Sequence, residues 1–228
     1  MNHWKELYSK KATSPTRAMR MIKPGARIFI GTGCGQPQLL VEELVKSDND
    51  IIDAEIYHLL TQGMAPYISE GYRSKFRTCS FFLAPNVRDG IKKGYGDYVP
   101  ICISNIPALF KTGKIPLDVA LIQTSPPDRH GNLSLGISVD IVKSAVENSL
   151  NVIAEVNEKM PRTLGDSFIS IDMVDAVVTS DRDILEHKQP EPDETVVAIA
   201  RNIASLIEDG STVEVGIGNI PQAVLKYL

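Results

Sequence analysis

The feature that most constrains this chain is a segment that occurs twice. Residues 25–40 contain a short β-branched run, a glycine loop and a proline before an apolar helical pattern, and residues 210–225 repeat this order near the end of the chain. A strand that leads through glycines into a helix is the unit from which parallel sheets are built. The chain therefore contains two starts of one unit, and only the first is followed by enough sequence to complete a domain.

Between the two copies, short apolar runs alternate with helical patterns. The runs lack strict alternation, which is typical of strands that are covered on both faces. We predict strands at 26–30, 53–60, 78–83, 98–101, 119–123, 152–156 and 174–179, and a further short strand before Gly216. We predict helices at 14–23, 37–46, 86–93, 104–111, 138–149 and 194–208.

This order predicts an α/β fold with an open parallel sheet over residues 1–188. Pro190 and Pro192 interrupt the periodicity, so the linker is expected at 189–193. Residues 194–228 then form the first elements of a second, repeated α/β domain. A length of 228 residues with 43% hydrophobic content suits one full domain and the beginning of another.

Composition excludes several classes of function. A net charge of −4 without a basic run argues against a nucleic-acid partner, and no apolar run is long enough to span a membrane. The three cysteines and four histidines lack ligand spacing, so no metal site is expected. We expect a protein of the reducing cytoplasm.

The glycines of both loops are candidates for binding an anion. Gly31, Gly33, Gly216 and Gly218 would let the backbone turn sharply and present N–H groups to a negatively charged oxygen. The alternative is that they only permit close packing of strand against helix. Two copies in equivalent places favour a function.

A dinucleotide-binding loop is a further alternative, but the match is partial. The GxGxG segment at 31–35 follows a strand, and Asp53 lies near the usual ribose-binding position. However, the third glycine is one place early and Pro37 opens the helix. In the second copy, Pro221 stands where the third glycine would be needed. The dinucleotide interpretation is therefore disfavoured.

Four separated segments together resemble a known family. Residues 125–136, 155–163, 192–195 and 216–224 are similar to the acetyl-CoA hydrolase/transferase family, in particular to its 4-hydroxybutyrate CoA-transferases. The resemblance extends over almost the whole chain. It implies two repeated domains of the open NagB/RpiA-like (CoA-transferase) type, the second of them incomplete here.

The resemblance also implies a reaction. Members of this family move coenzyme A from a short-chain acyl-CoA to a small carboxylate such as acetate, butyrate or 4-hydroxybutyrate, through an enzyme glutamyl-CoA thioester. They hold no permanent cofactor, because the coenzyme A thioester is a substrate, and a homo-oligomeric full-length enzyme is expected. The implied nucleophilic glutamate follows the second glycine loop by about twenty residues, so it falls outside this sequence, and these 228 residues alone are expected to be inactive.

Two other functions stay open at this point. Acetyl-CoA hydrolase belongs to the same family and differs by letting water take the second step. A non-catalytic module that binds a phosphate or a coenzyme A derivative through its glycine loops is the other.

The resemblance assigns roles to particular residues. It implies that the amide of Ile217, beside Gly218, contributes to an oxyanion hole, and that Arg182 lies near the active site. Arg182 could instead be a surface charge beside Asp181 and Asp183. The residues expected to bind substrate are Gly33, Gln36, Pro37, Gly216 and Asn219.

The other reactive side chains have simpler explanations. Cys34 is expected to fill a tight loop and not to act as a nucleophile, because no base accompanies it in the sequence. Asp128 and His130 lie in a proline-rich turn and are expected to be structural. Nothing in the sequence marks Glu155 as poised for catalysis, and Asn157 resembles a family position that shapes the interface between domains.

Overall fold

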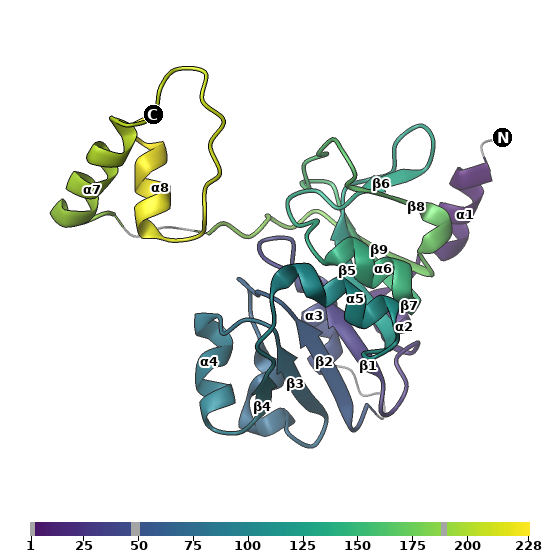
Figure 1. The fold of residues 1–228 in the computed structure, drawn as a ribbon. Coiled ribbons are helices and arrows are strands. Elements are labelled where there is room, and N and C mark those ends of the chain that lie inside the picture. The colour runs from purple at the N-terminus through teal and green to yellow at the C-terminus, as the bar shows by residue number, and fades with distance from the viewer. Residues whose placement is uncertain (1–2, 47–50, 188–190) are drawn as a thin grey trace. The chain divides into compact units, whose positions relative to one another are not determined.

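The computed structural model describes residues 3–46, 51–187 and 191–228, which form two compact units (Figure 1). The first unit is Met1–Glu186 and the second is His187–Leu228. The linker predicted at 189–193 begins outside the described residues, and its described part, 191–193, has no regular secondary structure.

The first unit is built on a seven-stranded sheet. Its strands are β1 (Arg27–Ile30), β2 (Ala54–His58), β3 (Phe76–Ser80), β4 (Gly96–Tyr98), β5 (Leu117–Thr124), β7 (Ser149–Asn157) and β9 (Ala176–Ser180). All neighbours are parallel, and the order is β4-β3-β2-β1-β5-β7-β9. The direction of winding reverses between β1 and β5. In open α/β sheets, ligands bind at the carboxyl ends of the strands at such a point.

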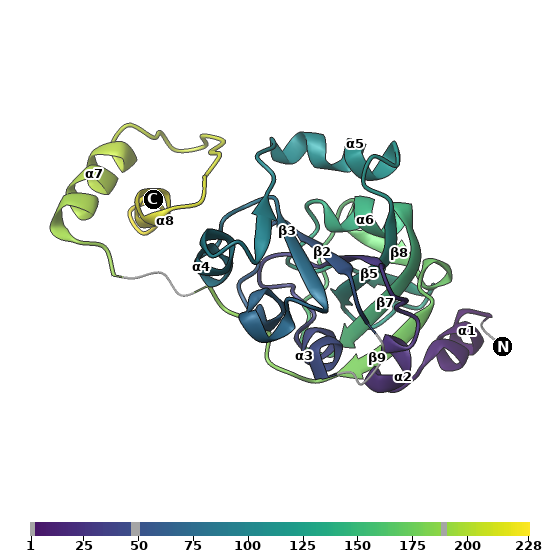
Figure 2. The ribbon, with the colours of Figure 1, turned by 90° about the horizontal axis from the view of Figure 1, so that it is seen from below.

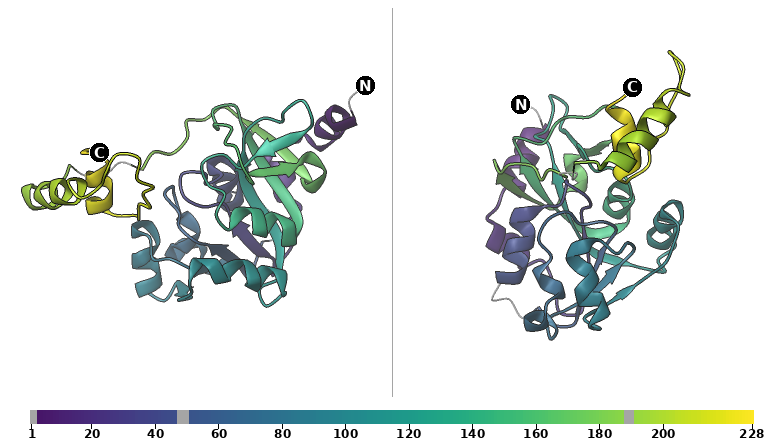
Figure 3. Two further views of the ribbon diagram at one scale, coloured as in Figure 1. Left: turned by 45° about the horizontal axis from the view of Figure 1, so that its top comes forward. Right: turned by 90° about the vertical axis from the view of Figure 1, so that its left-hand side faces the viewer.

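Helices cover both faces of this sheet (Figures 2 and 3). One face packs against α2 (Pro15–Met19), α3 (Gln38–Lys46) and α4 (Pro85–Lys92), and the other against α5 (Ile106–Lys111) and α6 (Val142–Asn148). Successive residues of a strand point to opposite faces, so Ile153 belongs to the first core while Val152 and Ala154 belong to the second. Burial on both faces explains why these strands appear as apolar runs in the sequence.

The seven strands predicted in residues 26–179 are all present, but smaller elements were missed. Helix α1 (His3–Lys11) and the antiparallel pair of β6 (Asn132–Ser134) and β8 (Phe168–Ser170) were not predicted. The helix predicted at 14–23 ends at Met19, because the next three amides bond to carbonyls only three residues back. Short 3₁₀ turns lie at Pro66–Ile68, Glu70–Tyr72, Ile103–Asn105 and Ile171–Met173.

The second unit contains two helices. Helix α7 (Glu194–Ala204) is capped at its N-terminus by Asp193, whose side chain accepts a hydrogen bond from the Val196 amide. Helix α8 (Asn219–Leu225) packs against α7 through a small core. The strand predicted before Gly216 is wrong for this structure, because residues 212–216 have no strand to pair with in the described part of the unit. An isolated strand leaves its backbone groups unpaired.

None of the helices in the described part of the chain has the length and apolar character needed to span a bilayer.

Candidate functional site

Polar side chains replace apolar ones where three neighbouring strands end. On the face of the sheet that packs against α3, the positions before the strand ends are apolar, as at Leu121, Ile153 and Val178. The last positions on the same face are polar, and all are buried. They are Gln123 on β5, Glu155 and Asn157 on β7, and Ser180 on β9.

Gln36 joins the loop after β1 to the loop after β2. Its side chain is fully buried, donates from Nε2 to the Met64 carbonyl at 2.8 Å and accepts from the Gly63 amide at 3.0 Å. Its own carbonyl accepts from Nε2 of Gln123 at 2.8 Å. The predicted substrate residue Gln36 therefore lies at the point where the winding reverses, but its side chain holds loops together.

Asn157 extends this network across the sheet. Its Nδ2 donates to Oε1 of Gln123 at 2.8 Å and to the Arg182 carbonyl at 2.9 Å, while its Oδ1 accepts from the Lys159 amide at 3.0 Å. Buried amides thus connect the loops that follow β1, β2, β7 and β9. Both partners of each of these hydrogen bonds belong to the protein, so the network holds the carboxyl edge of the sheet in one arrangement.

The first glycine loop uses its amides internally. The N–H groups at 31, 33 and 35 donate to acceptors of the protein itself, so the amides of Gly31 and Gly33, which we expected to be available to an anion, are already hydrogen-bonded. A bound oxyanion would have to break these bonds. The bonds join Gly31 to the Leu121 carbonyl, Gly33 to the Leu60 carbonyl and Gly35 to Oγ of Ser138.

Glu155 supplies the anion at the N-terminus of α3. Its Oε2 accepts from the Leu39 amide at 2.9 Å and from the Leu40 amide at 3.3 Å, and the residue is 1% exposed. Its Oε1 is buried with no hydrogen-bond partner among the residues that the structure describes. Burial raises the pKa of Glu155, although the Leu40 amide, the neighbouring Ser180 side chain, the Leu39 amide and the charge of Arg182 oppose the rise.

Arg182 is paired with Glu42 on α3. Nη1 and Nη2 donate to the two carboxylate oxygens of Glu42 at 2.7 and 3.0 Å. The hydrogen bond from Arg182 is the main reason that the pKa of Glu42 is lowered. The guanidinium that the resemblance places near the active site therefore already holds a carboxylate of its own chain. Asp183, the sequence neighbour of Arg182, pairs with Lys159.

The remaining predicted site residues lie in the second unit. Gly216, Ile217 and Gly218 form an exposed segment before α8, and the side chain of Ile217 is 82% exposed. Gly218 adopts φ +149°, a backbone conformation that favours glycine, and Asn219 begins the helix. The structure thus groups Gly33, Gln36, Pro37 and Arg182 in one unit and these four residues in the other.

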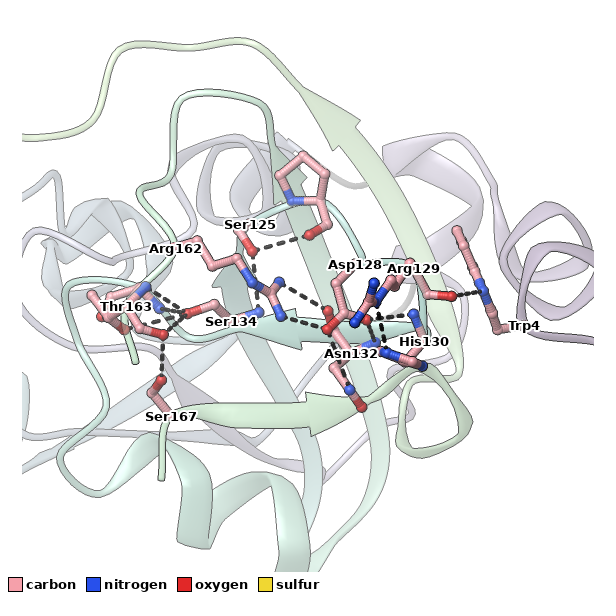
Figure 4. Close-up of polar contacts among 12 residues, drawn as sticks. Trp4, Ser125, Asp128, Arg129, His130, Asn132, Ser134, Arg162, Thr163 and Ser167 are labelled. Atoms are coloured by element: carbon pink, nitrogen blue, oxygen red, sulfur yellow. Dashed lines mark hydrogen bonds and ion pairs between the residues drawn. The ribbon is translucent and has the colours of Figure 1, made fainter. Parts of the chain in front are cut away.

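The loop that contains Asp128 and His130 is structural, as predicted (Figure 4). The Asp128 carboxylate accepts from the amides of His130 and Asn132 and pairs with Arg162 at 2.7 Å. Burial alone would raise the pKa of Asp128, but these hydrogen bonds and the guanidinium charge lower it. Trp4 closes the loop by donating from Nε1 to the Arg129 carbonyl. In the described part of the chain, no group of histidine, cysteine and carboxylate side chains could hold a metal ion.

Fold and site together define an open parallel α/β domain. Its polar edge, formed by the strand-end residues Gln123, Glu155, Asn157 and Ser180, lies beside the point where the direction of winding reverses. The N-terminal domain of the acetyl-CoA hydrolase/transferase family matches residues 1–187, and the chain belongs to this family. It is 42% identical over 225 residues to a 4-hydroxybutyrate coenzyme A transferase of Clostridium kluyveri, covering 99% of this chain and 52% of that protein. It is 36% identical to a succinyl-CoA:acetate/propanoyl-CoA:succinate CoA transferase of Fasciola hepatica, covering 97% of this chain and 46% of that protein.

Solved structures agree with this assignment. A 4-hydroxybutyrate CoA-transferase from Porphyromonas gingivalis superposes with a TM-score of 0.82 at 31% identity, covering 99% of this chain and 53% of that one. RipA from Yersinia pestis superposes with a TM-score of 0.87 at 27% identity, covering 98% and 55%. The chain spans about half the length of the curated relatives that it matches.

Glu155, Gln123 and Glu42 were not predicted as site residues from the sequence. A carboxylate inside the apolar run 152–156 is a signal, because a charge on a buried strand needs a binding partner. Glu155 is two positions after Ile153 and therefore lies on the same face of the strand. Gln123 gives a similar but weaker signal at the end of β5. No local signal could have found Glu42, because it lies on an ordinary amphipathic helix and its partner is far away in the sequence.

Proposed function

We propose that this chain contributes one half of the active site of a CoA-transferase that acts on short-chain acyl-CoA and small aliphatic carboxylates. The observation that supports this most strongly is the 42% identity to a 4-hydroxybutyrate coenzyme A transferase along 99% of the chain. Other relatives are named for succinate with acetate and for butyrate with acetate. All of these acids are small carboxylates, which supports the proposed substrate class.

The proposed chemistry proceeds through a glutamate that follows this sequence in the longer protein. The glutamate carboxylate attacks the acyl-CoA carbonyl, and the thiolate of coenzyme A leaves, which gives an acyl-glutamyl anhydride. The thiolate then attacks the glutamyl carbonyl and releases the free acid, leaving a glutamyl-CoA thioester. The second carboxylate reverses these two steps and departs as its own CoA thioester.

Each addition puts negative charge on a carbonyl oxygen. A backbone N–H at the position of that oxygen stabilises the charge without moving, and one such donor changes the rate by about 10²–10³. We assign this role to the amide of Ile217, because the segment 216–218 resembles the family segment that supplies such a donor and this amide has no acceptor among the described residues. Gly216 and Gly218 leave space for the approaching thioester, and Asn219 follows as a further polar contact.

We further propose that the polar edge of the first unit contributes to binding of the substrate carboxylate. Gln36 and Pro37 fix the turn between β1 and α3, and Gly33 lies in the same turn. Arg182 supports this edge from the end of β9 through its pair with Glu42. A phosphate-binding module is less well supported, because the first glycine loop has no spare amide at 31, 33 or 35 and Glu155 already fills the anion position of α3.

An exchange assay tests the proposal. The protein translated from the complete reading frame is incubated with butyryl-CoA and labelled acetate, and label in acetyl-CoA is measured against loss of thioester without acetate. We expect acetate-dependent exchange to exceed hydrolysis. Thioester loss that is independent of acetate would instead identify a hydrolase, and neither reaction with any short-chain thioester would refute both.

A further inference from the structure

We propose that Glu155 is a positioning residue: its carboxylate is the permanent anion of the α3 N-terminus and thereby holds the Gln36 loop and the Glu42–Arg182 pair in place. This inference rests on the proposed function only for its effect on catalysis. Its structural part stands on contacts within the first unit.

The first step of the argument is the position of the carboxylate. The first N–H groups of a helix have no partner inside the helix, and the helix dipole favours a negative charge beside them. In the P-loop and dinucleotide-binding strand–glycine–helix units, a phosphate of the ligand occupies this place. Here Oε2 of Glu155 accepts from Leu39 and Leu40 in the first turn of α3, so the protein supplies the anion itself.

The second step is burial. Glu155 is 1% exposed, and a charged group is costly to bury unless it is paired or hydrogen-bonded. One carboxylate oxygen has two amide donors and the other has no hydrogen-bond partner among the described residues. A side chain that served packing alone would be apolar at this point, as Ile153 is one position earlier on the same face.

The third step is what α3 carries. The helix starts directly after Gln36 and Pro37, so a shift of its first turn would move the Gln36 side chain away from Gly63 and Met64. One turn further along, Glu42 pairs with Arg182, and the charge of Glu155 also acts on that guanidinium. Glu155 thus influences the polar edge in two ways. Its hydrogen bonds fix the first turn of α3, and its charge acts on the Arg182 guanidinium.

Chemical rescue tests this assignment in the 228-residue chain. Glu155→Ala removes the carboxylate and leaves two unpaired amides beside a small cavity, which formate can enter. We expect formate at about ten times its Kd to raise the Tm of the variant by about 3–6 °C over sodium chloride of equal ionic strength. Formamide has the same shape without the charge and should give no comparable rise.

The controls distinguish this effect from general stabilisation. The unchanged chain and Glu158→Ala, which removes an exposed carboxylate three residues further on, should show no formate-specific rise. Equal responses of Glu155→Ala and these controls would overturn the proposal. If Glu155→Ala does not fold, Glu155→Gln is used, and the exchange of the Leu39 and Leu40 amides should be at least about tenfold faster than in the unchanged chain. Unchanged exchange rates would refute the assignment.

A second readout concerns catalysis in the protein translated from the complete reading frame. There, formate should restore part of the transfer activity that Glu155→Ala loses, because the anion repositions α3. Rescue of stability without rescue of activity would refute the positioning role. Absence of transfer in every form, including the unchanged protein, would refute the proposed function. The formate-dependent change in Tm would then still test the structural role of Glu155.

Discussion

Asn157 on β7 donates a buried hydrogen bond of 2.8 Å from its Nδ2 to Oε1 of Gln123 on the neighbouring strand β5. The same Nδ2 also donates to the Arg182 carbonyl, so one amide group joins the ends of three adjacent strands. Asparagine suits this position because it offers donors and an acceptor on one short side chain.

Asn157→Asp should therefore destabilise the fold strongly. The aspartate keeps the shape but replaces two donated hydrogen bonds by repulsion between its oxygen and two buried acceptors. We expect a loss of about 3 kcal/mol in the free energy of unfolding, measured by urea denaturation at pH 7. Asn151→Asp on the same strand is the control, because Asn151 is half-exposed and makes a single bond to the Asp118 carbonyl. Equal losses in both variants would contradict the prediction.

Gly35→Ala should destabilise the first glycine loop by steric contact. A Cβ at this position would lie 2.7 Å from Cβ of Ser138, which is too close for a short side chain to avoid. The expected loss is about 1–3 kcal/mol in the free energy of unfolding. Gly71→Ala, where nothing lies within 4 Å, should change it by less than about 0.5 kcal/mol.

A double variant checks the cause of that loss. Ser138→Gly removes the atoms that would collide, so Gly35→Ala should cost less in its presence than alone. Additive losses would show that contact with Ser138 is not the reason.

His58 should make the fold less stable in acid. The residue is fully buried at the end of β2, and burial lowers its pKa to about 4. In the unfolded chain it binds a proton near its ordinary pKa of about 6.5, so the unfolded state takes up more protons between these values. The free energy of unfolding should therefore fall as the pH drops from 7 to 4, by on the order of 3 kcal/mol from this residue.

Removing the imidazole tests the effect. His58→Leu should flatten this part of the pH profile of stability, measured by denaturation at several pH values. His3→Leu, which removes an exposed histidine, should leave the profile as it is. A profile with the same slope in all three proteins would exclude His58 as the cause.

Reversing the charge of Arg182 should lower transfer. In the protein translated from the complete reading frame, Arg182→Glu places two carboxylates together at the edge of the site, and we expect turnover to fall by about tenfold or more. The combined variant Arg182→Glu with Glu42→Arg restores the ion pair in the opposite direction. If Arg182 acts only by holding Glu42, the combined variant should recover both stability and turnover; recovery of stability alone would place the guanidinium against the substrate. An undiminished rate in Arg182→Glu would remove Arg182 from the site.

The amide of Ile217 can be removed without changing its neighbours. Ile217→Pro deletes the N–H and should lower the transfer rate by about 10²–10³, whereas Ile217→Ala keeps the N–H and should change the rate much less. Equal rates of the two variants in steady-state assays would exclude this amide from the oxyanion hole.

Much of the fold could be predicted because its signals are local. The apolar runs of β1, β5 and β7 and the helical pattern after Pro37 each depend on neighbouring residues, and the structure contains them near the predicted positions. The short pair β6–β8 was missed, because strands of three residues have no periodicity to detect. The strand expected before Gly216 was wrong for the opposite reason, since its local pattern is suitable but the described residues of the second unit offer it no strand to pair with.

The sequence by itself determined the strand–glycine–helix units, the parallel α/β class and the family, because each of these can be recognised from short stretches of neighbouring residues. Only the tertiary structure decided what the first glycine loop does. Its partners come from distant parts of the chain: Gln123 reaches Gln36 across 87 positions, and Glu155 reaches Leu39 across 116. Whether an N–H group is free for a ligand depends on such contacts, and local sequence does not encode them.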